Sequence, residues 1–360
     1  MKKALLALAP IVLALAAYLA FWPVPIEPVA WAAPVSTGYT GPHAANQRLA
    51  QLQHIDLKGE SGPEHVMIGP DGKLYTAVES GKILRMNPDG SGQEVFARTS
   101  GRVLGFDFDA AGNLVGADAF LGLVSIARDG KVTLLADKVD GDPIRFADAV
   151  AVARNGRIYF TDASTRFGAR EGGGIVEASM LEVIELSASG RVLEYDPATK
   201  KTRVIARGFS FANGIALSED QQSLFVNETG KFRIMKLSVQ GNSPAQVFLE
   251  NLPGYPDNLM RGQDGKIWAG LVKPRNADAD QLASKIFMRK LILRLPRAMW
   301  PLPKDRGHVF AFTEDGKVVA DMQDPTGAYP ETTSVTETAD RLYIQSLHGK
   351  TLGWMPRPTK

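Results

Sequence analysis

The stretch "PDGKLYTAV", residues 70–78, places a polar turn directly before a run of strand-forming residues, and the chain repeats this unit five more times. A polar turn followed by an alternating or continuous apolar run predicts a β-strand. Repetition of such a unit predicts a repeat architecture. The later copies are "AAGNLVGAD" (110–118), "RNGRIYFTD" (154–162), "EDQQSLFVNE" (219–228), "QDGKIWAGL" (263–271) and "TADRLYIQS" (338–346).

The spacing of the copies indicates the size of each repeat. If the first apolar residue of each strand is taken as a marker, successive markers lie 40, 44, 66, 43 and 75 residues apart. Three of these spacings match a propeller blade of about 40–50 residues, and the two long ones contain inserts. The markers are Leu74, Leu114, Ile158, Leu224, Ile267 and Leu342.

We therefore predict an all-β protein in which residues 49–360 form a six-bladed β-propeller with helical inserts at 166–189 and 274–306. The stretch "QLQHIDL" (51–57) is expected to pair into the last blade and close the ring, because an open ring leaves strand edges unpaired. A short helix is expected at 176–186. The helix expected at 278–300 mixes apolar and basic residues, so it either lies on an anionic membrane surface or packs on the propeller as a lid.

Composition excludes several classes of function. The chain has 360 residues and a formal net charge of +2, which gives no electrostatic reason to expect a nucleic-acid partner. It contains no cysteine, which excludes a structural disulfide, a thiolate metal site and a cysteine nucleophile. A G-x-S-x-G nucleophile elbow is also missing from the sequence, so a serine hydrolase has no support.

The N-terminus "MKKALLALAPIVLALAAYLAFW" places two lysines before an uncharged run over 4–22. That run approaches the roughly 20 residues needed to cross a bilayer. We predict that residues 1–22 are an uncleaved signal anchor, a transmembrane helix, followed by a linker rich in proline and alanine at 23–48. Lysines remain on the cytoplasmic side, so the propeller is expected on the periplasmic or extracytoplasmic side. The alternative is a cleaved signal peptide and secretion.

The repeat register predicts which side chains meet at the channel. The innermost strand of each propeller blade lines the central channel, and the residue before it lies at one mouth. Counting back ten positions from each marker gives Glu64, Leu104, Asp148, Gly214, Asp257 and Thr332. One position earlier lie Pro63, Val103, Ala147, Asn213, Pro256 and Glu331. Three blades thus present a carboxylate at one register, and a fourth presents an amide beside it.

A ring of carboxylates predicts a cation. Several carboxylates without a nearby Lys or Arg repel one another unless they are protonated or neutralised. Carboxylate and amide oxygens suit Ca²⁺, or another divalent cation such as Mg²⁺, whereas the lack of cysteine and of paired histidines disfavours zinc. The alternative is that these side chains hydrogen-bond strand ends and hold the blades together.

Four motifs identify a family resemblance. "GPEHVMIGPDGKLYTA" (62–77), "PIRFADAVAVARNGRIYFTDAS" (143–164), "GFSFANGIALSEDQQSLFVNET" (208–229) and "GYPDNLMRGQDGKIWAGL" (254–271) resemble the strictosidine synthase-like proteins. These are similar to the calcium-dependent six-bladed propellers that include gluconolactonases, paraoxonases and diisopropylfluorophosphatase-type hydrolases. The resemblance covers about residues 51–354.

The resemblance implies a ligand set. Carried over by motif, the metal ligands fall on Glu64, Asn213 and Asp257, and Asn258 matches an amide that contacts metal or substrate in some relatives. Ala147 departs from the family, which has Asn there, so Asp148 either replaces the missing group or holds a second, buried calcium.

The other polar residues near the expected mouth are candidates for substrate contacts. These are Asn258, His65 and Asp118, with packing or hydrogen bonding as the alternative role for His65. Asp118 stands where paraoxonases have a histidine of their catalytic dyad.

The function implied is a membrane-anchored, calcium-dependent hydrolase of lactones or aryl esters. A cation holds the carbonyl oxygen, and Asp257 or Asp148 is the general base that activates water. The expected partners are a small ester or lactone substrate and a membrane, contacted by the N-terminal helix and by 278–300. Two alternatives are a non-catalytic binding propeller with structural calcium and a strictosidine synthase-type condensing enzyme. The second is disfavoured because the synthase's catalytic Glu falls on Thr333, with Glu331 the nearest acid.

Overall fold

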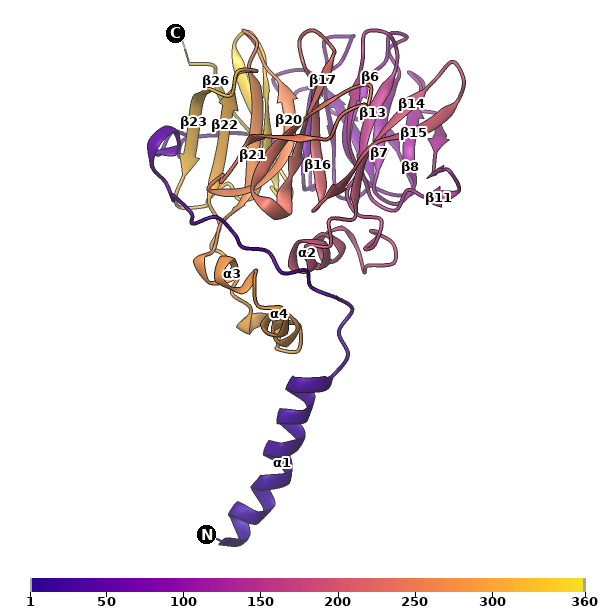
Figure 1. The fold of residues 1–360 in the computed structure, drawn as a ribbon. Helices are drawn as coiled ribbons and strands as arrows, with labels where there is room; N and C mark the ends of the chain where they lie inside the picture. Colours follow the sequence, from indigo (N-terminus) through magenta and orange to yellow (C-terminus); the bar gives the residue numbers. More distant parts are fainter. Residues whose placement is uncertain (1, 359–360) are drawn as a thin grey trace.

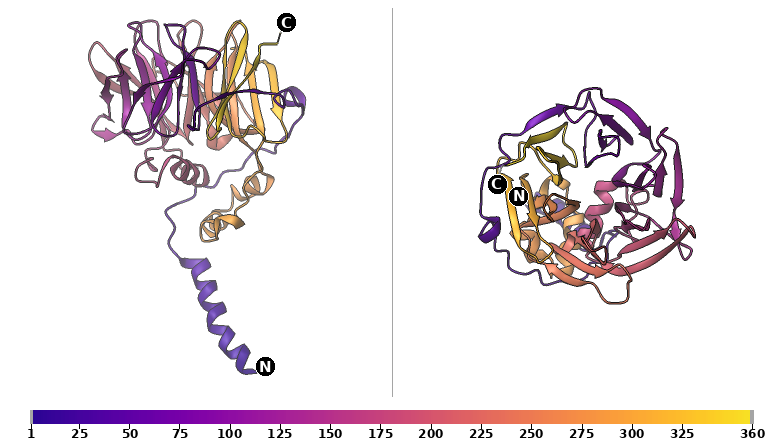
Figure 2. Two further views of the ribbon diagram at one scale, coloured as in Figure 1. Left: turned by 180° about the vertical axis from the view of Figure 1, so that it is seen from behind. Right: turned by 90° about the horizontal axis from the view of Figure 1, so that it is seen from above.

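The repeated turn-and-strand units fold into six four-stranded antiparallel sheets that surround one central channel (Figure 2). The computed structural model describes residues 2–358, and for residues 2–8 only the backbone. The inner strands of neighbouring sheets contact one another around the channel. This arrangement confirms the predicted six-bladed β-propeller.

The first three blades follow one another along the chain, each running from its inner to its outer strand. Blade 1 contains β2 (His65–Ile68), β3 (Leu74–Ala77), β4 (Lys82–Met86) and β5 (Glu94–Arg98). Blade 2 contains β6 (Val103–Phe108), β7 (Leu114–Asp118), β8 (Gly122–Ile126) and β9 (Val132–Ala136). Blade 3 contains β12 (Ala147–Val152), β13 (Ile158–Asp162), β14 (Gly190–Asp196) and β15 (Lys201–Phe209). A small hairpin precedes it, formed by β10 (Lys138–Val139) and β11 (Asp142–Pro143).

The last three blades include the one that closes the ring. Blade 4 contains β16 (Ala212–Leu217), β17 (Ser223–Glu228), β18 (Arg233–Ser238) and β19 (Gln246–Leu249). Blade 5 contains β20 (Gly254–Arg261), β21 (Ile267–Pro274), β22 (Gly307–Phe312) and β23 (Val318–Asp324). Blade 6 contains β24 (Thr332–Glu337), β25 (Arg341–Ser346), β26 (Thr351–Pro356) and β1 (Gln53–Asp56). The pairing of Ile55 with Leu352 confirms the predicted closure by the N-terminal strand.

Burial explains why the second strand of each unit is so apolar. All residues of β3 and β13 are buried, because these strands lie between an inner and a third strand and pack on both faces. The outer strands β5 and β9 are mostly exposed or half-buried. Neighbouring blades share their cores, as where Val192 of blade 3 packs in one cluster with Ile215 and Val226 of blade 4. Strands buried on both faces show continuous apolar runs rather than alternation.

The helices lie at one end of the ring (Figure 1). They are α1 (Lys2–Phe21), α2 (Ile175–Glu185), α3 (Ala277–Leu282) and α4 (Ile286–Leu293), with 3-10 turns η1 (Gly41–His43), η2 (Thr229–Lys231) and η3 (Arg297–Met299). The single helix predicted at 278–300 was wrong, because the chain turns between α3 and α4. There the Arg289 guanidinium donates to Ala283 O (2.8 Å) and to Val29 O (2.7 Å).

Residues 2–21 are helical, but the predicted transmembrane helix is not supported. Within the part of the chain that the structure describes, no helix is both long enough and apolar enough to span a bilayer.

The segment after α1, predicted as a linker over 23–48, packs against the inserts and the ring. Ile26 is fully buried, Glu27 N donates to Glu185 Oε2 (2.6 Å), and Arg275 Nη2 donates to Pro34 O (2.6 Å). Figure 1 shows this segment running from α1 past α2 to the side of the ring. It therefore fixes the position of the helices that cover the channel mouth.

Candidate active site

The inner strand of four blades breaks its pairing register at the same place. In each break two inner-strand residues face one residue of the second strand, which is the pattern of a β-bulge. Bulges redirect side chains away from the regular alternation. The residues inside the breaks are Asp148 and Ala149 in β12, Asn213 and Gly214 in β16, Asp257 and Asn258 in β20, and Thr333 and Ser334 in β24.

The predicted count of ten residues was wrong by one position in two blades. The connection from the bulge to the marker is one residue longer in blade 4 and one shorter in blade 6. Asn213 and Thr333, rather than Gly214 and Thr332, therefore share the register of Asp148 and Asp257.

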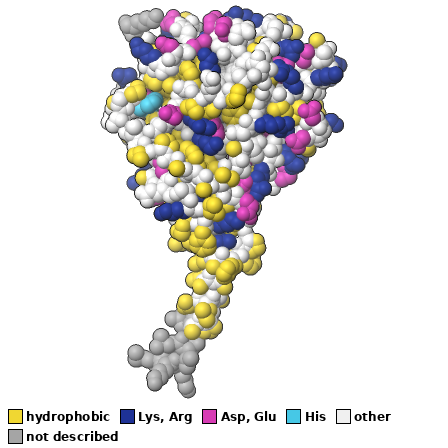
Figure 3. All heavy atoms as spheres, viewed as in Figure 1, with side chains coloured by type: hydrophobic (Ala, Val, Ile, Leu, Met, Phe, Trp, Pro, Cys, Tyr) yellow, Lys and Arg dark blue, Asp and Glu magenta, His cyan; other side chains and the backbone are white. Residues whose placement is uncertain are grey.

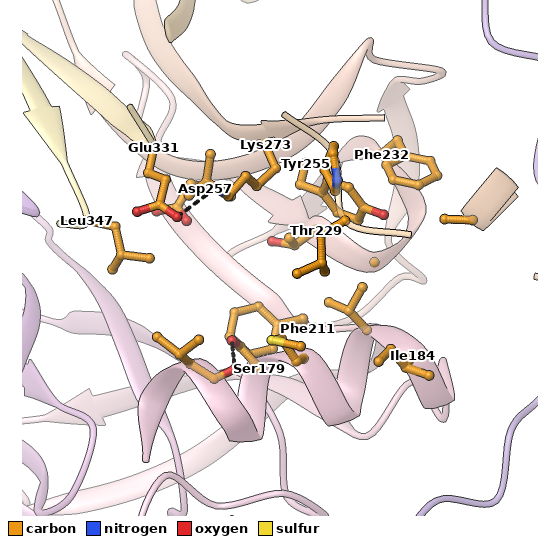
Figure 4. A pocket seen from close by; sticks show the side chains of 18 of the residues that line it. Ser179, Ile184, Phe211, Thr229, Phe232, Tyr255, Asp257, Lys273, Glu331 and Leu347 are labelled. Carbon is orange, nitrogen blue, oxygen red and sulfur yellow. Dashed lines mark hydrogen bonds and ion pairs between the residues drawn. The ribbon is translucent and has the colours of Figure 1, made fainter. Parts of the chain in front are cut away.

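Four of the sequence-predicted residues converge on one cavity. Glu64, Asp148, Asn213 and Asp257 all line a cavity of about 910 Å³ at the mouth of the channel. Each of these side chains is buried, with 3–6% of its residue surface exposed. Segments nearly two hundred residues apart in sequence thus meet at the end of the ring where the helices lie (Figure 4).

The carboxyl groups in this cavity resist ionisation. Burial raises the pKa of Glu64 to about 7, against the lowering effect of the Arg102 guanidinium. Burial, and then the charges of Asp257 and Glu64, raise the pKa of Asp148 well above its usual range. Burial and the Glu64 charge do the same to the pKa of Asp257. A nearby positive charge favours the ionised form of such acids, so a bound cation would stabilise them as carboxylates.

Unpartnered oxygen atoms lie in the same place. Asn213 Oδ1, Asp257 Oδ1 and Asn258 Oδ1 are buried and have no hydrogen-bond partner among the described residues, and the first two line the cavity. Asn258, a predicted substrate contact, does not line it. Leaving a buried polar atom unpaired costs about 1–3 kcal/mol. Carboxylate and amide oxygens are the ligands that Ca²⁺ prefers. The residues present therefore fit a divalent cation, which Glu64, Asn213 and Asp257 would hold.

Hydrogen bonds between blades fix the backbone around these ligands. The Thr333 hydroxyl donates to Glu64 O (2.7 Å), and Asn258 Nδ2 donates to the same oxygen (3.1 Å). Arg102 Nη2 donates to Glu64 Oε2 (2.8 Å), so part of the Glu64 carboxylate is shared with a guanidinium. The sequence register did not predict Arg102, because it lies in the loop before β6, two residues ahead of the expected mouth position.

Gly214 is required for the close approach of blades 4 and 5. A Cβ atom at this position would lie 2.4 Å from Leu259 N and 2.5 Å from Asp257 O. Gly214→Ala is therefore expected to destabilise the protein by about 1–3 kcal/mol and to weaken calcium binding, because Asp257 must move. Urea denaturation and calcium titration measure the two effects. The matched variant Gly307→Ala, whose Cβ meets nothing nearer than 3.1 Å, is expected to change both much less; equal behaviour of the two variants would contradict this account.

His65 and Asp118 lie outside the cavity. The His65 ring is buried against Phe106, with 4.7 Å between ring centroids, and burial lowers the pKa of His65 to about 4. Asp118 Oδ1 accepts from the backbone N–H groups of Arg102 (3.2 Å) and Phe120 (3.0 Å) and so holds a turn. Neither residue lines the cavity, so the structure gives no support for a substrate contact by either.

A charged rim at the cavity was not predicted from the sequence. Lys273 Nζ lies 2.8 Å from Glu331 Oε1, and His348 Nδ1 bonds the other oxygen of Glu331. Burial alone would raise the pKa of Glu331, but the bonds from His348 and Lys273 lower it to about 2. The bond to Glu331 raises the pKa of His348 in turn. Figure 4 shows Lys273 and Glu331 beside Asp257.

The rest of the cavity wall is apolar and comes largely from the inserts. Phe146, Phe211 and Phe232 line it from the loops of the ring. Met180 and Ile184 of α2 and Trp300 of the second insert also line it, and Phe146 and Phe211 pack in one cluster with α2. Figure 4 shows α2 facing Asp257 and Glu331 across the open space. The cavity can therefore hold a bulky apolar group next to the polar cluster.

A second polar cluster lies on blade 5, away from the cavity. Asp321 Oδ2 accepts from His43 Nδ1 (2.8 Å) and from His308 Nε2 (2.7 Å). The sequence shows no paired histidines, but in the fold His43 and His308 come together on one carboxylate. The hydrogen bonds to His43 and His308 lower the pKa of Asp321, although burial opposes them. This cluster attaches the N-terminal segment to the ring.

Comparisons with known proteins identify the family. A strictosidine synthase-like N-terminal domain matches residues 41–86, and a strictosidine synthase domain matches residues 148–242. The chain is 32% identical over 324 residues to the protein STRICTOSIDINE SYNTHASE-LIKE 10 of Arabidopsis thaliana, covering 81% of this chain and 84% of the relative. It is 30% identical to an adipocyte plasma membrane-associated protein of Danio rerio, covering 89% and 82%. The chain belongs to the strictosidine synthase-like family.

Solved structures confirm the class of fold. A gluconolactonase from Xanthomonas campestris superposes with a TM-score of 0.63 at 21% identity, covering 92% of this chain and 99% of that one. A regucalcin from Agrobacterium tumefaciens, described as a calcium-binding protein, gives a TM-score of 0.55 at 14% identity, covering 84% and 93%. At these identities the likeness shows the propeller fold alone.

Proposed function

We propose that the protein is a calcium-dependent hydrolase of lactones or aryl esters. One observation carries the proposal. Asn213 and Asp257 each have a buried oxygen without a partner, and the pKa values of Asp257, Glu64 and Asp148 are all raised. Similar propellers include a gluconolactonase and a calcium-binding regucalcin, which supports both parts of the proposal.

The residues of the cavity have different roles in the proposed reaction. A divalent cation held by Glu64, Asn213 and Asp257 would supply Lewis acidity to a substrate carbonyl. Asp148 lines the same cavity but belongs to another blade, and its carboxylate would take a proton from water once a cation offsets the burial and the neighbouring charges that raise its pKa. The aromatic walls bind the apolar part of the substrate and exclude water from the reacting group.

The direct test is a metal analysis of the purified chain, followed by a panel of lactones and aryl esters with and without a chelator. We expect bound calcium and turnover that the chelator abolishes and added calcium restores. Turnover that persists in the chelator would overturn the calcium dependence.

A non-catalytic binding propeller with structural calcium is the second candidate function. It is favoured by one observation, the buried apolar side chain of Ala147 where the family has an amide. It predicts a calcium-dependent melting temperature without turnover on any member of the panel. A condensing reaction of the strictosidine synthase type is not proposed, because Thr333 is fully buried and its hydroxyl is committed to Glu64 O.

The role of Asp148 as a base gives a separable prediction. Asp148→Asn is expected to lower kcat by about 10²–10⁴-fold, the usual contribution of a general base, while calcium still binds. Steady-state kinetics and calcium titration measure the two properties. The control is Asp107→Asn, which alters a half-buried acid outside the cavity whose pKa desolvation raises to about 6. A kcat for Asp148→Asn equal to that of the control would exclude Asp148 as the base.

We also propose that the protein acts in contact with a membrane. The names of the adipocyte plasma membrane-associated relatives support it.

A further inference from the structure

The cavity end of the molecule carries a cluster of exposed apolar side chains. In and around α4 these are Ile286 (46% exposed), Phe287 (56%), Met288 (38%), Met299 (63%) and Leu302 (60%), here called the basal surface. Figure 3 shows hydrophobic side chains gathered where the helices leave the ring. Exposed apolar residues that occur singly are normal, but a group of them marks an interaction site.

The basal surface continues into the N-terminal helix. Arg294 of the second insert donates to Trp22 O (2.7 Å) and to Leu19 O (3.0 Å), which attaches the end of α1 to the end of α4. At this junction Phe21 is 82% exposed and Trp22 is 59% exposed. The apolar face therefore extends over two helices that are distant in sequence.

The segment that forms the surface is basic. Residues 281–304 contain Lys285, Arg289, Lys290, Arg294, Arg297 and Lys304, and no Asp or Glu. Arg289 and Arg294 are buried, and their guanidinium groups donate hydrogen bonds to backbone carbonyl oxygens, which holds α4 in place. Lys285 and Lys304 have no ion-pair partner among the described residues. Apolar side chains bordered by free lysines complement a bilayer whose headgroups are anionic.

The cavity opens within this surface. Leu302 and Lys304 belong to the basic segment and also line the cavity, together with the exposed Val176 of α2. A substrate dissolved in the lipid phase would meet the cavity without crossing water. This route of substrate entry rests on the proposed function, whereas the apolar and basic character of the surface does not depend on it.

We infer that the basal surface is a docking site for an anionic lipid bilayer, on which the protein lies with the cavity mouth toward the lipid. The contact is interfacial and needs no helix that spans the bilayer. The N-terminal helix and α4 contribute to it together.

The test uses the full chain and vesicles of phosphatidylcholine with or without phosphatidylserine. We expect the chain to sediment with vesicles that contain phosphatidylserine and less with those that lack it. The double variant Ile286→Ser/Phe287→Ser is expected to weaken the binding at least about tenfold, since it removes many apolar groups from the contact. The control Val95→Ser/Val247→Ser alters side chains of similar exposure, 54% and 45%, on the outer strands β5 and β19, and is expected to bind as the wild type does.

Several results would overturn the inference. They are absence of binding by the wild type, equal binding by the Ile286→Ser/Phe287→Ser variant, and a dimer in solution that this variant abolishes. The last would assign the surface to a second copy of the chain. Unchanged melting temperatures show that the variants fold, since all four side chains are exposed. No substrate is present, so failure of the hydrolase proposal leaves this test intact.

Discussion

Replacing Asp257 with asparagine is expected to abolish the calcium-dependent activity. The change removes one negative charge and one oxygen that has no other partner, while the shape of the side chain is kept. Mutation of a residue that only hydrogen-bonds a metal ligand typically lowers the affinity for the metal about 10–100-fold. Loss of a direct ligand should therefore lower the calcium affinity by more than that. Isothermal titration with calcium and an assay on the best substrate of the panel measure the effect.

The Asp107→Asn variant is the control for Asp257→Asn as well. It also converts a strand carboxyl to an amide, at a half-buried position whose oxygens accept from the backbone N–H groups of Val152 and Phe108 and do not line the cavity. It should bind calcium and turn over substrate normally. If Asp257→Asn bound calcium as tightly as this control, Asp257 would not be a ligand.

Without metal, the protein is expected to lose stability as the pH rises. Glu64, Asp148 and Asp257 have folded-state pKa values raised by burial, and those of Asp148 and Asp257 are raised further by neighbouring carboxylates, so the folded state binds protons that the unfolded state releases above about pH 4. The stability contributed by these three groups is therefore full below that pH and is lost as the pH rises through the folded pKa values. For Glu64, with a folded pKa of about 7, the loss is on the order of 3 kcal/mol.

Urea denaturation in a chelator, at about pH 5 and about pH 8, measures this loss. Calcium at a hundred times its Kd should restore about 2.7 kcal/mol, and it should do so more effectively at the higher pH. Asp257→Asn should be more stable than the wild type in the chelator at the higher pH, even though it no longer responds to calcium. A metal-free wild type as stable at pH 8 as at pH 5 would show that folding does not raise the pKa values of these carboxyls.

The blade repeat could be predicted because each unit repeats one local pattern. A polar turn and a strand buried on both faces recur in every blade, so "PDGKLYTAV" and its copies predicted six sheets. The pairing of Ile55 with Leu352 followed from the need to protect the last strand edge. The convergence of Glu64, Asn213 and Asp257 followed from register and from the family resemblance.

Other features could not be predicted, because they depend on contacts that no repeat describes. Lys273 belongs to β21 of blade 5, whereas Glu331 and His348 lie in loops beside the strands of blade 6, and only the folded ring brings the three together. His43 reaches Asp321 because the N-terminal segment wraps around the outside of the ring. A one-residue change in turn length was enough to misplace the expected register at Thr333.

The central claim is that side chains from three blades hold one divalent cation at the mouth of the channel. The most direct measurement is anomalous diffraction from crystals of the protein in which manganese replaces calcium. One strong peak is predicted within coordination distance of Asn213 Oδ1, Asp257 Oδ1 and the Glu64 carboxylate. If instead the density there were water, with Glu64 bound to Arg102 alone and Asp257 protonated, the account of the site would be contradicted.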